Sequence, residues 1–342
     1  MLLMRIGVLF CLLTTVLAES YQENTQSSCT LLPAFNADAL NETTRMGFID
    51  SNGRLIIGFR YYYVQEFHEG LAVVQLTRDG KQGYVDLEGA VAISPQFDWA
   101  FPFFDGRAKV QVSHKFGYVD REGKMIIEPR FDEAYNFREE MAAVRYGGKW
   151  GYLDRNGKML IRPKFEKVNS FSEGLASVVQ NGLIGYLDKS GNWVITPRFE
   201  AIPSPTDAVF LPNFSEGLAV VRIAGRYGYI GRLGEIIVQP QFEKAEGFSE
   251  GLGLIRINNK AGYICRNSQI LISPRFDAAR SFSEGLAAVR IDDKWGYINK
   301  AGSIAIPPQF DTAESFSCGL AKVWIGTAWG YINRDGRYVW KR

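Results

Sequence analysis

The sequence predicts an all-β protein in which tandem repeats of about 34 residues stack into an open solenoid or superhelix. Three observations lead to this prediction. A corner element of the form Phe-Ser-Glu-Gly-Leu-Ala recurs along the chain, and a Gly-Tyr pair recurs in phase with it. An Asp/Asn-x-x-Gly turn and a Pro-x-Phe element follow each pair in a fixed order. A period this regular is typical of a repeat architecture rather than of two ordinary domains.

The corner element begins with a phenylalanine in every copy. We expect its Ser and Glu side chains to bond to backbone amides at a tight turn and its Gly to provide the bend. We expect the Phe, and a second Phe six residues earlier, to pack against the neighbouring repeat, because one repeat buries too little apolar surface to be stable alone. The copies begin at Phe67, Phe103, Phe137, Phe171, Phe214, Phe248, Phe282 and Phe316.

Each repeat is predicted to be a three-stranded antiparallel meander. In the best copy, Leu286–Ile291 and Trp295–Asn299 are apolar, β-branched or aromatic runs typical of strands. Asn299–Gly302 has the residues of a tight turn, and a third strand over 303–306 ends where prolines begin. The glycines of the Gly-Tyr pairs are Gly83, Gly117, Gly151, Gly185, Gly228, Gly262, Gly296 and Gly330.

The sequences KWGYIN, DxxGKxxIxPxF and FSEGLA resemble the WG-repeat (KWG-repeat) family of bacterial proteins. The resemblance extends from Gly47 to Arg342. The tryptophan that gives the family its name is present only at Trp150, Trp295 and Trp329. The resemblance implies a repeat architecture and secretion, and it brings no catalytic residues.

Residues 1–18 are predicted to be a signal peptide. A charged start is followed by an apolar run and by Val16-Leu17-Ala18, which places cleavage between Ala18 and Glu19. An uncleaved anchor is the alternative, although no later stretch is long and apolar enough to span a membrane. Residues 19–43 are interpreted as a linker and cap that includes Leu32–Phe35, and residues 44–342 as an array of about nine units.

The chain ends bear on whether the array closes. Nine Gly-Tyr hairpins, counting the variant Gly47-Phe48, occur with only eight corners. The repeat array is therefore predicted to start on a second strand and to end on a third, so the two ends duplicate each other. This favours the open array, and the alternative is a closed β-propeller of eight or nine blades.

One insertion breaks the period, near residues 202–212. Insertions in repeat proteins often project on the binding face. The candidate ligand-binding residues therefore belong to this loop and are Pro203, Pro205, Asp207, Phe210 and Pro212. The alternative is a tolerated, proline-stiffened loop without function.

Composition excludes some function classes. Lys plus Arg (39) nearly balances Asp plus Glu (37) without runs of like charge, so no nucleic-acid partner is expected. Cys29, Cys265 and Cys318 remain after signal removal, and their number and spacing predict neither a zinc site nor a disulfide scaffold. Cys265 and Cys318 stand at turn and corner positions, where they are interpreted as drift within repeats, and whether any of the three forms a bridge stays open.

No catalytic site, metal site or cofactor is predicted. His68 and His114 are the two histidines, and no hydrolase, phosphate-loop or dinucleotide motif occurs. We expect a secreted or periplasmic, envelope-associated scaffold that is not an enzyme and that binds a protein partner. A module that binds a cell-envelope glycan is the alternative, and a carboxylate-dependent hydrolase is a third.

Overall fold

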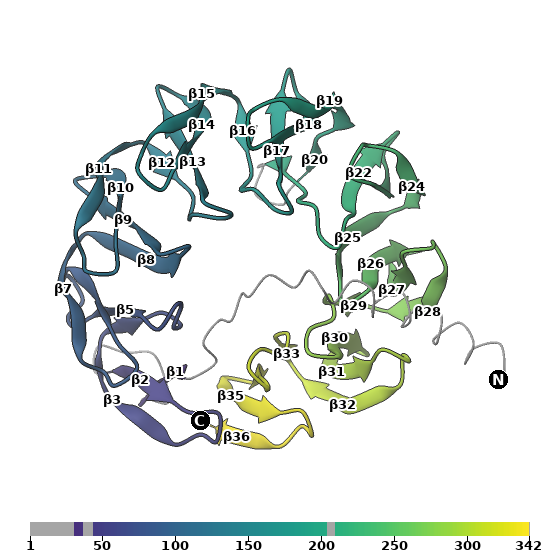
Figure 1. Ribbon diagram of the computed structural model, residues 1–342. Helices are drawn as coiled ribbons and strands as arrows, with labels where there is room; N and C mark the ends of the chain where they lie inside the picture. The colour runs from purple at the N-terminus through teal and green to yellow at the C-terminus, as the bar shows by residue number, and fades with distance from the viewer. Residues whose placement is uncertain (1–30, 37–43, 204–208, 342) are drawn as a thin grey trace. The chain divides into compact units, whose positions relative to one another are not determined.

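The computed structural model describes residues 31–36, 44–203 and 209–341. In these ranges the chain forms nine small antiparallel sheets of three or four strands and one two-stranded hairpin, and no helix. Inside each sheet the strands follow one another in chain order, as in the sheet β25-β26-β27-β28 (Figure 1). The predicted all-β class is confirmed.

The chain divides into two compact units. The N-terminal unit comprises the described residues up to Gln180 together with 187–192, and the C-terminal unit comprises 181–186 and the described residues from Trp193 onwards. The strands of the first four sheets are β1 (Leu32–Phe35), β2 (Met46–Ile49), β3 (Leu55–Tyr61); β4 (Tyr63–Val64), β5 (Ala72–Gln75), β6 (Gln82–Val85), β7 (Val91–Phe97); β8 (Trp99–Phe104), β9 (Arg107–Val112), β10 (Lys115–Val119), β11 (Met125–Phe131); β12 (Glu133–Ala134), β13 (Met141–Tyr146), β14 (Lys149–Asp154), β15 (Met159–Phe165).

The boundary between the units falls, along the chain, within the fifth sheet. Its strands are β16 (Lys167–Val168), β17 (Leu175–Gln180), β18 (Leu183–Asp188) and β19 (Trp193–Glu200). The remaining strands are β20 (Ile202–Pro203), β21 (Val209–Phe210); β22 (Ala219–Ile223), β23 (Arg226–Ile230), β24 (Ile236–Phe242); β25 (Lys244–Ser249), β26 (Leu252–Ile257), β27 (Lys260–Cys265), β28 (Ile270–Phe276); β29 (Ala278–Ala279), β30 (Leu286–Ile291), β31 (Lys294–Asn299), β32 (Ile304–Phe310); β33 (Thr312–Ala313), β34 (Leu320–Ile325), β35 (Ala328–Asn333), β36 (Tyr338–Lys341).

The predicted meander is confirmed in β30, β31 and β32. The turn between β31 and β32 forms as expected, because the Asn299 carboxamide oxygen accepts from the amides of Ala301 and Ser303 at 3.0 and 3.1 Å. Gly302 has φ +78°, the left-handed conformation that closes this turn.

Each Gly-Tyr glycine permits a close approach between two strands. The pairing of β31 with β32 shifts register on both sides of Tyr297. A Cβ on Gly296 would lie 2.5 Å from the Ile306 carbonyl oxygen and 2.6 Å from the Pro308 nitrogen. No side chain fits there, so the glycine is required by this irregular pairing with the proline-bearing strand.

Most sheets have four strands, one more than the sequence predicted. The Phe-Asp-x-Ala segment, interpreted as a link, holds a short first strand: Ala278 pairs with Arg290 and Ala279 with Val289. Two-residue strands carry too little periodicity to be recognised in a sequence. A four-stranded antiparallel sheet in chain order is the form that the blades of a β-propeller have. The β-propeller alternative is therefore matched, with nine sheets in the described residues, and the preferred open solenoid is not.

The first sheet corrects the argument from the chain ends. Leu32–Phe35 is not a covering cap but strand β1, which pairs antiparallel with β2. The first Gly-Phe hairpin thus has a preceding strand, and the sheet order is β1-β2-β3. The first hairpin is therefore not without a preceding strand, and the inference from the chain ends that favoured an open array fails. The predicted signal peptide, with Ala18 and Glu19, lies outside the described residues.

Aromatic rings pack between successive sheets, as predicted. Phe276 and Phe282 are each 1% exposed, in a core cluster that joins residues of β26–β28 to residues of β30 and β31. The ring of Phe282 contacts Tyr263 edge-on at a centroid distance of 4.8 Å. The same Tyr–Phe contact recurs at other blades, for example between Tyr118 and Phe137.

The corner side chains bond between repeats, which corrects the expectation of local bonds. The Glu250 carboxylate accepts from the backbone amide of Gly285 in the next corner, at 3.0 and 3.2 Å. The Ser249 hydroxyl donates to the carbonyl of Phe282 at 2.8 Å rather than accepting from an amide. The corner thus joins one repeat to the next.

Neither Cys265 nor Cys318 is a free thiol, since both are disulfide-bonded. Cys265 is 2% exposed at the end of β27. Their interpretation as drift within repeats was wrong, because each takes part in a covalent bond. Cys29 lies outside the described residues.

Candidate functional site

A row of backbone carbonyls lies on or near the first strands of successive sheets, and a tyrosine of the preceding sheet donates to each one. The donors are the buried tyrosines of the Gly-Tyr pairs, and the hydrogen bonds measure 2.7 to 3.2 Å. We call the accepting residues the first-strand row. They are Phe101, Tyr135 and Asn169 in the N-terminal unit and Pro212, Glu246, Arg280 and Glu314 in the C-terminal unit.

The row combines a constant backbone with variable side chains. Six residue types occupy its seven positions, whereas the tyrosine donor is the same in every case. Packing requires the tyrosine and the carbonyl but not a particular side chain in the row. A side chain in the row can therefore vary without loss of the tyrosine–carbonyl bond.

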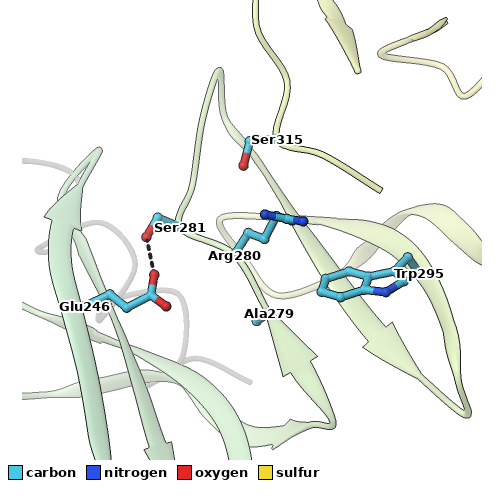
Figure 2. Close-up of a pocket in the computed structure, with 6 residues that line it drawn as sticks. All are labelled: Glu246, Ala279, Arg280, Ser281, Trp295 and Ser315. Atoms are coloured by element: carbon cyan, nitrogen blue, oxygen red, sulfur yellow. Dashed lines mark hydrogen bonds between the residues drawn. The ribbon is translucent and has the colours of Figure 1, made fainter. Parts of the chain in front are cut away.

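A pocket of about 400 Å³ opens along this row in the C-terminal unit. It is lined by residues of three successive sheets, as Figure 2 shows. Glu246 lies on β25, Arg280 and Ser281 directly follow β29, and Ser315 follows β33. The other lining residues are Ala279 and Trp295.

Arg280 is held in the pocket at two points. Its Nε donates to the carbonyl of Ala313 at 2.9 Å. Its guanidinium carbon lies 5.6 Å from the centre of the Trp295 ring, within range of a cation–π interaction. Among the described residues its two terminal nitrogens make no hydrogen bond and no ion pair. The side chain is thus oriented while the fork that binds carboxylates stays free.

Glu246 stands across the pocket from Arg280 (Figure 2). Its Oε2 accepts from the Ser281 hydroxyl at 3.3 Å. The surrounding protein atoms raise the pKa of Glu246 above its usual value, opposed by the Ser281 hydrogen bond and by the charges of Arg280, Arg256 and Lys244. The side chain nevertheless keeps contact with solvent at the mouth of the pocket.

In the N-terminal unit a lysine makes the contact that corresponds to the bond between Arg280 and the Ala313 carbonyl. Lys109 Nζ donates to the carbonyl of Ala134 at 2.9 Å, as Arg280 does to that of Ala313. The ammonium lies 3.9 Å from the centre of the Phe101 ring and 5.3 Å from that of Phe116. Burial lowers the pKa of Lys109 to about 8.

A second cluster replaces the corner serines in the N-terminal unit. His68 and Phe104 stack at a centroid distance of 4.8 Å, and Arg138 covers Phe104 at 4.3 Å. Burial lowers the pKa of His68. These three residues occupy the Ser position of successive corners, so a stack of side chains replaces the Ser–carbonyl bonds found from Ser215 onwards.

The structure does not bring the predicted insertion residues together with this pocket. Pro203 and Phe210 belong to the short hairpin of β20 and β21, where Phe210 is 52% exposed. Pro212 is buried, and its carbonyl accepts from Tyr186. Pro205 and Asp207 lie outside the described residues, and the binding role of the loop stays a prediction.

Sequence reasoning missed Glu246, Arg280 and Trp295 as a group. Glu246 and Arg280 stand two residues before a corner Phe, in a segment interpreted as a link. The available signal was the variation of this position, two residues before a corner Phe that is the same in every copy. Across the described part of the chain, no group of His, Cys, Asp and Glu could hold a metal ion. No helix in that part is long and apolar enough to cross a membrane.

The repeats match the family described as WG containing repeat. The match covers eight segments: residues 46–81, 83–115, 116–150, 150–183, 184–227, 227–260, 262–295 and 295–323. The chain belongs to the WG-repeat family. Its Trp position has a structural role, since Trp150 packs against Tyr135 at 4.9 Å and Trp295 against Arg280, each a residue of the first-strand row. A search of curated proteins finds no match.

A comparison with solved structures finds one that resembles this WG-repeat protein in fold and others with lower scores. A crystal structure of the eukaryotic initiation factor superimposes with a TM-score of 0.61 at 8% identity, over 87% of this chain and 92% of that one. Dihydro-heme d1 dehydrogenase NirN matches with a TM-score of 0.48 at 14% identity, over 92% of this chain and 73% of that one. Virginiamycin B lyase from Staphylococcus aureus matches at 0.35 and 16% identity, over 70% and 92%. Only the TM-score of 0.61 indicates a shared fold, and an identity of 8% indicates nothing about activity.

Proposed function

We propose that this WG-repeat protein is a secreted or envelope-associated scaffold that binds a partner protein through the side chains of its first-strand row, and that it is not an enzyme. The observation that carries the proposal is the contrast between a fixed backbone and variable side chains in the row. Repeat proteins use such positions for recognition, because a side chain there can change without loss of the fold.

The pocket in the C-terminal unit supports binding rather than catalysis. Its polar groups include two hydroxyls, one carboxylate and one guanidinium; the one contact between a hydroxyl and a carboxylate, from Ser281 to Glu246, is long at 3.3 Å, and no histidine lines the pocket. Arginine and tryptophan are the residues that most often dominate protein interfaces. Arg280 and Trp295 provide both in one place.

A glycan-binding module is the second candidate. The aromatic ring of Trp295 in the pocket wall favours it, since sugars stack on aromatic faces. Arg280 covers one face of that ring, however, and leaves less of it for a sugar. We therefore prefer a protein partner. The proposed export agrees with the signal-like sequence of residues 1–18.

Photo-crosslinking from defined positions tests the proposal. A photoreactive residue in place of Glu314, in the row, should capture a partner protein. The same residue in place of Ile304, 47% exposed on β32 of the neighbouring sheet, should capture none and is the matched control. Capture from position 304 alone, or from neither position, would contradict the proposal. Capture of a saccharide from position 314 would favour the glycan alternative.

A further inference from the structure

We propose that the pocket beside Trp295 binds the carboxylate of an acidic side chain on the partner protein, with Arg280 as its main ligand. This inference rests on the proposed function and adds the chemistry of the partner. It depends on three features: the way in which Arg280 is fixed, the hydroxyls around it, and the charges near the pocket.

Arg280 is prepared for a carboxylate before any partner binds. The Nε bond to Ala313 and the Trp295 ring set the plane of the guanidinium, and the pocket lies beside it (Figure 2). Two parallel N–H donors match the two oxygens of a carboxylate, and a fork that is already oriented loses little side-chain entropy on binding. Arg280 is exposed, so a partner can reach it.

Ser315 supplies a further donor. It lines the pocket on the third sheet, and its hydroxyl makes no hydrogen bond within the described residues. Ser281, by contrast, donates to Glu246. A carboxylate held by Arg280 can therefore also accept from Ser315.

The negative charge of Glu246 repels a bound carboxylate. The direction in which affinity changes when Glu246 is neutralised therefore tests the inference. Three cations act on Glu246, namely Arg280, Arg256 and Lys244, so positive charge exceeds negative charge among these groups. An anionic ligand should bind more tightly when Glu246 is neutralised. A cationic or zwitterionic ligand should bind more weakly, because it would use Glu246 as its counter-ion.

Titration with two blocked peptides is the direct test. Acetyl-Gly-Glu-Gly-amide and acetyl-Gly-Gln-Gly-amide have the same shape but differ in charge. Binding is followed by NMR through the side-chain Nε–H signal of Arg280, identified by its loss in the Arg280→Lys variant. The Glu peptide should bind at least about tenfold more tightly than the Gln peptide, as expected for hydrogen bonds to a charged group.

Variants complete the design. Arg280→Lys keeps the charge but removes the fork, and by isothermal titration calorimetry it should weaken binding of the Glu peptide about tenfold. Glu246→Gln should strengthen binding, and Arg275→Gln, whose side chain donates to Gly302, should have no effect. Equal binding of the two peptides, no binding of either, or weaker binding by Glu246→Gln would overturn the inference. Tighter binding of glucuronate than of the Glu peptide would do the same and indicate a sugar acid.

Failure of this test is separable from failure of the proposed function. Crosslinking from position 314 does not depend on a carboxylate in the partner. A partner captured there, together with no binding of the Glu peptide, would reject only the carboxylate. Loss of both results would reject the scaffold proposal as well.

Discussion

The hydroxyl of Tyr263 donates a 2.7 Å hydrogen bond to the backbone carbonyl of Arg280, 17 residues further along the chain. The ring of Tyr263 is fully buried, and burial strongly raises the pKa of its hydroxyl, so the group stays protonated as a donor. This one contact joins two successive sheets and fixes the backbone from which the Arg280 side chain extends.

Tyr263→Phe should lower the free energy of unfolding by roughly 1–3 kcal/mol, because it leaves a part-buried carbonyl without its donor. Equilibrium denaturation in urea measures the change. Tyr146→Phe is the control, since Tyr146 is exposed and its hydroxyl has no hydrogen-bond partner in the described residues. Equal stability of both variants would show that the hydroxyl bond contributes nothing.

Gly296→Ala should destabilise the protein by at least about 1–3 kcal/mol, the range for overpacking, because its Cβ would meet backbone atoms of β32. Gly58→Ala is a matched control in another strand, where a Cβ would meet nothing within 4 Å. That control should be neutral or slightly stabilising. Thermal unfolding of the two variants distinguishes them, and similar losses in both would contradict the close-approach explanation.

The corner carboxylates should stabilise the junction between repeats. The Glu284 carboxylate accepts from the Gly319 amide at 2.9 Å. Glu284→Ala should cost about 1 kcal/mol or more, as for other hydrogen bonds with a charged acceptor. Glu284→Gln keeps an acceptor oxygen and should lose less. Hydrogen exchange at the Gly319 amide is the local measurement, and unchanged protection in Glu284→Ala would refute the bond.

The protein should be less stable in acid, because protonation of aspartate weakens the lysine–aspartate pairs that join neighbouring sheets. Two hydrogen bonds hold the pKa of Asp311 below its usual value of 3.8: the bond from Lys294 has the larger effect and the bond from the Gly326 amide the smaller one. A folded-state pKa that is depressed gives stability above the unfolded-state value, and this stability is lost as pH falls through the folded-state value. Asp311→Asn should therefore be less stable than wild type at neutral pH, and the difference should disappear in strong acid.

Thermal unfolding measured across this pH range tests the pair. Asp335→Asn, which removes a turn carboxylate that accepts no hydrogen bond in the described residues, is the control and should follow wild type at every pH. A difference between Asp311→Asn and wild type that persists in strong acid would contradict the prediction.

Much of the fold follows from the repeat, because each repeat contains residues that only one local structure satisfies. The turn needs a left-handed residue, which Gly302 provides, and Asn299 bonds to the amides of the same turn. The short first strands could not be predicted, since β29 and β33 each have two residues and depend on pairing with the next strand. The preference for an open array came from missing strand β1, which pairs with the first Gly-Phe hairpin.

The candidate site was less accessible to prediction. Glu246 and Arg280 belong to different repeats, and only the stacking of sheets brings them to one pocket. The sequence shows that their position varies, but not that the backbone there is fixed by a tyrosine of the preceding sheet. The insertion near 202–212 attracted attention because it breaks the period, whereas the pocket lies where the period is intact.

The central claim is that the first-strand row serves recognition and not folding. The most direct measurement is the free energy of unfolding of the double variant Glu246→Ala and Glu314→Ala. We predict a value within about 0.5 kcal/mol of wild type for each position changed, as for ordinary surface substitutions. A loss at each position as large as that expected for Tyr263→Phe would contradict the claim and assign the row to the stability of the fold.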